Sequence, residues 1–395
     1  LKIREIGASQ DENSVKTIIE LNKELSEIRK KINDVKIQCD LDNIIIRHGG
    51  LDYNAFTDYD RTCYICSFPS NKLELWFLIE SDRMKNLALR EFYTEIGVVL
   101  AEKRNRGNDN PNSLISKKLW GMVFAGNPYG RPSGIIGEAG DIEVFSRKEV
   151  MDYYNTYYAP DNAVIVLIGD FNSEKIIEWA DHYFSSIPAG GAKKPNKSFF
   201  DCPKQKEERR LEIEFFAGSR AVIGYKTVAA SHPDSVILRF IEELLGGGKG
   251  SRFNKNLVDG RIAVSIDVCN YSMIHSGIFE ISFRPAENNE IGDIEKIIYK
   301  ELQNLQNGII SENEIAVVKK RMEVDFARGL DSLNGLIYNL SFYEIAGDWR
   351  KINDFIPSVR KITSQDIVKV AKKYFIEENR SVVILRDNRK KDGNE

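Results

Sequence analysis

The spacing of apolar and polar residues divides the first part of this chain into helix-like and strand-like stretches. Residues 11–38 are highly charged, follow a helical period and contain little Gly or Pro, which predicts one long amphipathic helix or two in tandem. A strand is predicted at Cys63–Phe68, where β-branched and aromatic residues cluster. Three further helices are predicted after it, at about 70–85, 88–105 and 112–124.

The second part of the chain opens with strands and closes with helices. Four strands are predicted, over Leu211–Phe216, Ala221–Thr227, Ala263–Val268 and Gly277–Phe283. A helix ends at Gly246 between the second and third strands, and four helical stretches occupy Ile291–Tyr374. Strand hairpins followed by runs of helix predict an α+β fold with a mainly antiparallel sheet.

An internal repeat relates the two parts. Ser146 and Thr363 each stand three residues before an acidic residue, and this pattern begins a helix with a capping box. Each helix leads into a predicted strand, at Ala163–Gly169 and at Arg380–Leu385. The offset is constant, because 363 − 146, 375 − 158 and 379 − 162 all equal 217. The chain is therefore predicted to contain two related α/β domains, each a mainly antiparallel sheet with helices packed on it.

The joint between these domains is predicted at a segment rich in Pro, Gly and Lys. It begins at Pro188 and continues to about Pro203, a composition typical of an exposed linker. The predicted boundaries are 1–187 for the first domain, 188–207 for the linker and 208–395 for the second domain.

One predicted helix carries three carboxylates along one side. At about 100° per residue, Glu95 lies about 40° from Glu91, and Glu102 lies about 20° from Glu95. Phe92 and Val99 share this face, so it is partly apolar. Carboxylates on such a face are costly unless cations or hydrogen-bond donors meet them. The pattern indicates either a buried ion-pair network or a metal ligand.

Composition and charge exclude several classes of function. The chain has 395 residues and a net charge of −3, which implies neither nucleic acid nor an anionic membrane as a partner. It has no run of 18 apolar residues that would span a bilayer. Cys63 and Cys66 fall on opposite faces of a predicted strand, so a zinc knuckle is not expected there. The first residue is Leu1, and a processed or truncated N-terminus is expected.

Several motifs, in order along nearly the whole chain, resemble the insulinase/pitrilysin family of zinc peptidases. They are Gly50 with Asn54-Ala55-Phe56-Thr57 and Thr62-x-Tyr64, Glu95-x-x-Val98-Val99-x-x-Glu102, Asn127-Pro128-Tyr129-Gly130-Arg131-Pro132, Tyr158-Ala159-Pro160-Asp161-Asn162, and Gly246-Gly247-Gly248 with Ser251-Arg252. Members of this family have duplicated α/β domains, which agrees with the repeat.

The resemblance implies an inverted-zincin site, in which His-x-x-Glu-His and a later Glu hold a catalytic zinc ion. By position, Glu95 matches the third zinc ligand, with Glu91 and Glu102 as neighbours that orient the ligands. The implied edge strand, which pairs with the backbone of a peptide substrate, contains Asn54, Ala55, Phe56 and Thr57.

The sequence also departs from the family pattern. It contains no His-x-x-Glu-His, and its four histidines are scattered, at His48, His182, His232 and His275. The motif is expected upstream of Leu1, together with the first strands, so the N-terminal domain is expected to be incomplete. The chain as given is not expected to bind catalytic zinc alone. A truncated or cleaved active-type subunit is favoured over a naturally site-less homologue, because Glu95 and the edge strand are kept.

A second departure concerns an Arg and a Tyr, seven residues apart, that active members often use to hold the substrate carbonyl. Leu257 and Val264 occupy those places, and neither side chain donates a hydrogen bond. A homologous subunit, or a second half of a longer chain, is expected to supply the pair. Two functions remain: a metalloendopeptidase that encloses peptides in a two-halved chamber, or a non-catalytic scaffold or regulatory member of the same fold.

Overall fold

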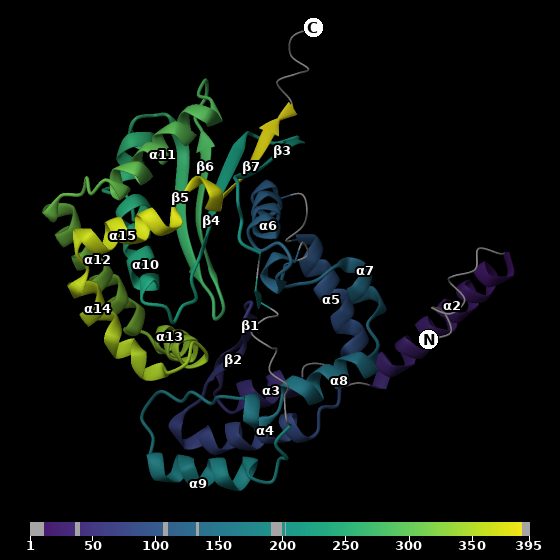
Figure 1. Ribbon diagram of the computed structural model, residues 1–395. Helices are drawn as coiled ribbons and strands as arrows, with labels where there is room; N and C mark the ends of the chain where they lie inside the picture. Colours follow the sequence, from purple (N-terminus) through teal and green to yellow (C-terminus); the bar gives the residue numbers. More distant parts are fainter. Residues whose placement is uncertain are drawn as a thin grey trace. The chain divides into compact units, whose positions relative to one another are not determined.

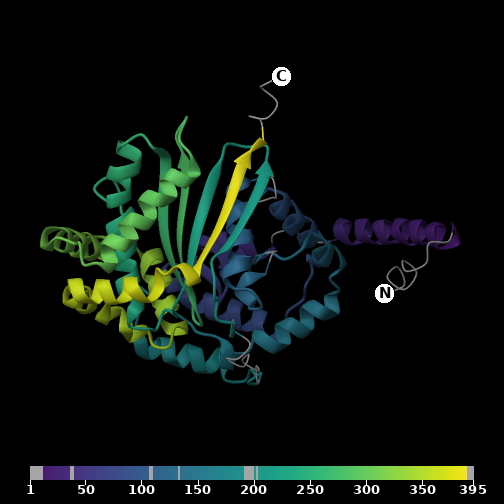
Figure 2. The same cartoon turned by 45° about the horizontal axis from the view of Figure 1, so that its top comes forward.

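A computed structural model describes most of the chain (Figures 1 and 2). The described residues are 12–35, 40–105, 110–131, 134–190, 200–201 and 203–388. They fall into two units. The first comprises Leu1–Ala55 and Tyr64–Val98, and the second comprises Phe56–Cys63 and Val99–Glu395. None of the helices in the described ranges is long and apolar enough to cross a membrane.

The first unit contains the predicted long helix and a strand hairpin. Its elements are α2 (Glu12–Val35), α3 (Asp40–Arg47), β1 (Leu51–Thr57), β2 (Thr62–Ser67), η1 (Ser70–Lys72), α4 (Leu73–Lys85) and the first half of α5 (Phe92–Asn105). Strands β1 and β2 form a two-stranded sheet whose tip, Phe56–Cys63, belongs to the second unit. The helices predicted at 70–85 and 88–105 are thus confirmed, and the helix predicted at 11–38 is confirmed over its described part, Glu12–Val35.

The second unit is built on a five-stranded sheet. Its strands are β3 (Arg209–Phe215), β4 (Arg220–Thr227), β5 (Ala263–Ser272), β6 (Gly277–Pro285) and β7 (Arg380–Asp387). They are ordered β3-β7-β4-β6-β5. Only β3 and β7 pair in parallel, and the other three pairings are antiparallel. The predicted mainly antiparallel α+β fold is therefore confirmed.

Alternation along β4 separates two hydrophobic cores. Ile223 and Tyr225 point into the larger core, against α10 (Asp234–Gly246), α11 (Ile291–Gln306) and α15 (Ser364–Tyr374). Val222 points to the opposite face, where α6 (Pro111–Val123) packs. Figure 1 shows α10, α11 and α15 on one side of the sheet and α6 on the other.

The second unit contains further helical elements besides these. They are η2 (Pro128–Gly130), α7 (Ala139–Val144), α8 (Arg147–Tyr157), η3 (Pro160–Asn162), α9 (Ser173–Phe184), η5 (Asn254–Asp259), α12 (Glu312–Leu330), α13 (Leu333–Ile345), η6 (Trp349–Asp354), α14 (Phe355–Lys361) and η7 (Glu377–Asn379). Five α-helices therefore lie between Ile291 and Tyr374, where four were predicted. The extra break occurs at Gly347, whose φ is +129°, and at Asp348, whose side chain caps η6.

The repeat is visible in the structure, with one exception. Ser146 and Thr363 both form complete capping boxes, and each helix is followed by a 3-10 turn, η3 and η7. The prediction of a strand at Ala163–Gly169 is wrong, because this segment has no paired strand among the described residues. Its counterpart β7 lies between β3 and β4 and obtains a hydrogen-bonded ladder from both. As a result Ile165 is 43 % exposed, whereas Val382 at the equivalent position is 0 % exposed.

The predicted linker at 188–207 is described only in part, since residues 191–199 and 202 lie outside the described residues. The boundaries 1–187 and 208–395 stay predictions.

Candidate functional site

Strand β1 presents the predicted substrate-binding residues at an open edge. Asn54, Ala55 and Thr57 are exposed, and Phe56 is half-buried. Within the described part of the chain, β1 pairs with β2 on one side only. Its other edge therefore carries backbone N–H and C=O groups that have no strand partner there, the arrangement an added peptide strand requires.

The turn after β1 is held by Arg61, whose side chain is only 5 % exposed. The guanidinium pairs with Asp58 at 2.9 Å and donates to the Ser341 hydroxyl at 2.7 Å. It also lies 4.6 Å above the ring of Tyr338, a cation–π contact. These contacts fix the turn to α13.

A second anchor of the same turn is Asp60. Its carboxylate accepts hydrogen bonds from the Tyr129 hydroxyl at 2.5 Å and from the backbone N–H of Ile274 at 2.9 Å. Burial raises the pKa of Asp60, against the opposing effect of these two donors. The turn residues 58–61 are thus held by both α13 and the loop between β5 and β6.

The three carboxylates predicted to share a helix face occupy less similar positions than expected. Glu91 precedes α5, which begins at Phe92, and its carbonyl accepts the Glu95 backbone N–H at 2.9 Å. Glu95 and Glu102 are exposed, whereas Phe92 is buried. Because Glu95 and Glu102 are exposed, these two side chains are not part of a buried ion-pair network; the other alternative, a metal ligand, stays a prediction.

The residues present do not form a zinc site by themselves. Glu95 and Glu102 are seven positions apart on α5, a rise of about 10.5 Å along the helix axis. No group of three or more His, Cys, Asp or Glu in the described ranges is placed to hold a metal ion. Glu95 as a zinc ligand, with Glu91 and Glu102 as its neighbours, stays a prediction.

The places of the substrate-holding Arg and Tyr are filled by Leu257 and Val264. Leu257 is fully buried in η5, and Val264 is 56 % exposed at an irregularity in β5. Nearby Arg252 is already engaged, since its guanidinium pairs with Glu314 at 2.8 Å and with Glu301 at 3.3 Å. Burial alone would raise the pKa of Glu314, but hydrogen bonds from Arg252 and Ser311 lower it to about 2.

The sequence contains a further internal repeat that was not predicted. Glu314-Ile-Ala-Val-Val on α12 repeats Glu95-Ile-Gly-Val-Val on α5, and 314 − 95 and 321 − 102 both equal 219. Glu314, at the position equivalent to Glu95, binds the Arg252 cation. Arg321, at the position equivalent to Glu102, donates to the Gly247 carbonyl at the end of α10. In the second repeat, both positions of this helix face make charged contacts.

Comparisons with known proteins agree with this architecture. A family model described as "Peptidase M16 inactive domain" matches residues 145–322. The chain is similar to the zinc protease PqqE of Helicobacter pylori, with 27 % identity over 357 residues, covering 88 % of this chain and 79 % of that protein. It is also similar to the human mitochondrial-processing peptidase subunit beta, with 22 % identity over 368 residues, covering 90 % and 72 % of the two chains. A crystal structure of a protease from Helicobacter pylori superposes with a TM-score of 0.80 at 27 % identity, covering 87 % of this chain and 84 % of that one.

Proposed function

This chain belongs to the peptidase M16 family, the insulinase/pitrilysin family, and we propose that it is the peptide-holding subunit of a zinc metalloendopeptidase. The open edge of β1, with Asn54, Ala55 and Thr57 exposed, carries this proposal. A peptide in extended conformation would add to this edge through backbone hydrogen bonds, and such pairing requires an unfolded segment rather than a particular sequence.

The internal repeat supports the proposal that Glu95 binds a cation. Its equivalent Glu314 meets the guanidinium of Arg252, so the second repeat satisfies this carboxylate with a protein cation. Within the described residues, Glu95 belongs to no group of three or more His, Cys, Asp or Glu side chains that could hold a metal ion, so further ligands would have to come from elsewhere. We therefore assign Glu95 as the acidic ligand that this chain contributes to zinc, with Glu91 and Glu102 next to it. The imidazoles and general base of His-x-x-Glu-His are not among these 395 residues.

A homologous partner fits the same proposal. Leu257 and Val264 cannot donate hydrogen bonds to a substrate carbonyl, and Arg252 is held by two glutamates. We propose that a homologous subunit or second half supplies the Arg and Tyr and closes a chamber around the peptide. One of the similar proteins, the human mitochondrial-processing peptidase subunit beta, is a subunit according to its name.

The second candidate is a non-catalytic scaffold or regulatory member of the family. The match of residues 145–322 to a family model described as an inactive domain favours it.

The experiment that separates the two uses the complete product of the gene, expressed with its candidate partner. Zinc content and cleavage of an unstructured fluorogenic peptide are measured for the natural protein and for Glu95→Gln. Stoichiometric zinc and cleavage that Glu95→Gln abolishes would support the peptidase. Absence of both in the natural complex would support the scaffold.

Two matched variants test the assignment within the helix. Glu91→Gln and Glu102→Gln remove the same charge from the same stretch of chain, and we expect them to weaken zinc binding by about 10–100-fold rather than abolish it. If Glu102→Gln removes the zinc and Glu95→Gln retains it, the ligand is Glu102.

Strand addition has its own test, independent of cleavage. A peptide methylated on alternate backbone nitrogens cannot complete a ladder, and we expect its affinity to fall about tenfold or more relative to the unmethylated peptide. Equal affinities would show that β1 is not the binding edge.

A further inference from the structure

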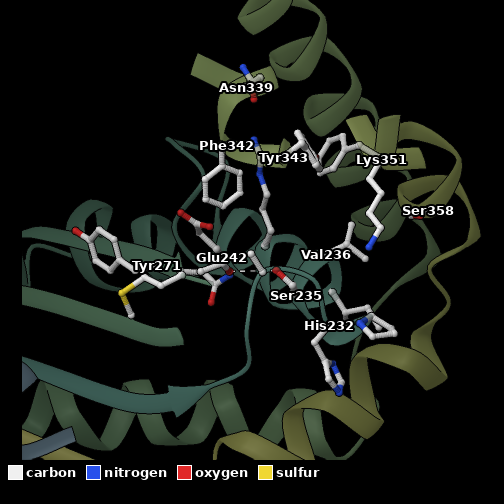
Figure 3. Close-up of a pocket in the computed structure, with 18 of the residues that line it drawn as sticks. His232, Ser235, Val236, Glu242, Tyr271, Asn339, Phe342, Tyr343, Lys351 and Ser358 are labelled. Carbon is white, nitrogen blue, oxygen red and sulfur yellow. Dashed lines mark hydrogen bonds between the residues drawn. The ribbon is translucent and has the colours of Figure 1, made fainter. Parts of the chain in front are cut away.

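A cavity of about 1020 Å³ lies in the second unit. Its walls come from α6, α10, α13, η6, α14, the end of β5 and the turn after β1. Figure 3 shows side chains from these elements around one space, among them Glu242, Tyr271, Phe342 and Lys351. The volume is in the range of a site for a small ligand or a few residues of peptide.

One wall of this cavity is apolar and incompletely covered. Helix α13 has no fully buried side chain although most of its residues are apolar. Phe342 and Tyr343 of this helix line the cavity, and Tyr338 is 51 % exposed at its rim. Val236 and Phe355 lie on the other walls. A ligand that fills the cavity would bury this aromatic surface.

Four cationic side chains line the same cavity with their donors unused. They are Lys117, Arg239, Lys351 and Lys361. None of them forms an ion pair or side-chain hydrogen bond within the described part of the chain. The guanidinium of Arg239 lies 4.7 Å from the centre of the Phe355 ring, a contact that leaves its in-plane N–H groups available for an acceptor.

Three of the five carboxylates around the cavity, by contrast, already have donors. Asp58 pairs with Arg61, Asp60 accepts from Tyr129 and Ile274, and Asp366 accepts from the backbone N–H and hydroxyl of Thr363. The other two are Asp354, which makes no capping hydrogen bond to α14, and Glu242.

Glu242 stands on α10 three residues after Arg239. Burial raises the pKa of Glu242 to about 7, so its carboxyl balances the guanidinium less fully than an ordinary carboxylate would. The backbone N–H of Asn270 and the charge of Arg239 oppose this rise, and Glu243 adds to it. The cavity therefore offers more unused donors than unused acceptors.

We propose that this cavity binds a carboxylate of a peptide, with the adjoining apolar side chain seated against Phe342 and Tyr343. Arg239 is the central donor, and Lys351 is a second donor at the rim. The proposal rests on the proposed function only in taking the ligand to be a peptide. The carboxylate has two sources, the free C-terminus of an apolar residue or an Asp or Glu side chain beside one.

The test measures equilibrium binding of three fluorescein-labelled unstructured peptides without zinc. The first ends in Phe with a free carboxylate, the second is its C-terminal amide, and the third is that amide with Glu before Phe. The free acid should bind about 10–100-fold tighter than the plain amide, as expected for a charge-assisted hydrogen bond. If the Glu-containing amide equals the free acid, side-chain carboxylates are accepted; if it equals the plain amide, the chain terminus is required. Equal affinity of all three peptides would overturn the proposal.

Variants place this preference in the cavity. Arg239→Gln should reduce the ratio of free-acid affinity to amide affinity to near one. Arg328→Gln, a matched change at an exposed position of α12, should leave this ratio unchanged. Arg239→Lys keeps the charge and is the variant to use if Arg239→Gln disturbs the fold. We expect it to lower the acid-to-amide affinity ratio only partly. An unchanged ratio in both Arg239 variants, or an equal loss in Arg328→Gln, would overturn the assignment. These affinity ratios are measured without zinc and do not depend on cleavage. A failure of the proposed function is therefore distinguishable from a failure of the cavity proposal.

Discussion

Trp120 on α6 donates its indole N–H to the carboxylate of Glu280 on β6 at 3.1 Å. Both residues are nearly inaccessible, at 8 % and 9 % exposed. Burial raises the pKa of Glu280, and the indole donor opposes this rise. The contact joins α6 to the face of the sheet that the larger core does not use.

Removing this donor should destabilise the second unit. Trp120→Phe leaves the Glu280 carboxylate buried without its indole partner, and we expect the free energy of unfolding in urea to fall by about 1–3 kcal/mol. Trp349→Phe, at a 44 % exposed position, is the control and should change it by less than about 0.5 kcal/mol. In a Glu280→Leu background the cost of Trp120→Phe should shrink; an undiminished cost would mean that packing, not the hydrogen bond, is responsible.

Glu242 should make stability fall as pH rises. Its folded-state pKa is raised from 4.5 to about 7, so the folded state binds more protons than the unfolded state between those values. The contribution of Glu242 to stability is therefore greatest below pH 4.5 and declines as pH rises through about 7, by at most about 3 kcal/mol. Urea unfolding between pH 4.5 and 8 should show a shallower decline for Glu242→Gln than for the natural chain. The decline should not vanish, because burial also raises the pKa of Glu243. Glu378→Gln, on the surface, should follow the natural curve.

Glu314 should act in the opposite direction. Its pKa is lowered to about 2, so its contribution to stability is present above about 4.5 and lost as pH falls from there. Glu314→Gln keeps a side chain that can complete the capping box with Ser311 but removes the charge that faces Arg252. With its side chain 35 % exposed, we expect a loss of about 1–2 kcal/mol at pH 7 after screening by solvent. The difference in free energy of unfolding between Glu314→Gln and the natural chain should be smaller at pH 3.5 than at pH 7. A constant difference from pH 7 to pH 3.5, or an equal loss in Glu312→Gln, would contradict this assignment.

The approach of α6 to the sheet depends on Gly224. A Cβ atom there would lie 2.9 Å from Leu119 Cδ2, and Leu119 is fully buried. Gly224→Ala should therefore cost about 1–3 kcal/mol, and Leu119→Ala about 2–5 kcal/mol. The double variant should cost less than the sum, because each change makes room for the other. Gly97→Ala in α5 meets nothing within 4 Å and should be neutral or stabilising. Additive costs would mean that the two residues do not share this contact.

Local patterns predicted most elements of this chain because they depend on neighbours in sequence. The capping boxes of Ser146 and Thr363 identified both helix starts and the repeat itself. The strand prediction at Ala163–Gly169 failed because a strand exists only where another strand pairs with it. Five helices replaced the four predicted near the C-terminus because a single glycine, Gly347, ends α13.

The candidate sites were harder to predict from the sequence than the secondary structure. The carboxylates of α5 were found from their spacing, but their exposure depends on what packs against the helix. The cavity at Arg239 left no signal in the sequence, because its walls combine residues from Asp58 to Asp366 that only the folded chain brings together. The equivalence of Glu95 and Glu314 was readable in the sequence, whereas its partner Arg252 became apparent only from the geometry.

The segment Ala163–Ile168, which pairs with no strand among the described residues, has a consequence for handling the protein. Its six residues, Ala-Val-Ile-Val-Leu-Ile, are uncharged, mostly β-branched and free of Pro, with Val164 57 % exposed. Such hexapeptides stack readily into cross-β fibrils when no other strand covers them. The solubility of the chain is therefore tied to the covering of this one hexapeptide, and a charged gatekeeper at Val164 should keep concentrated solutions free of fibrils.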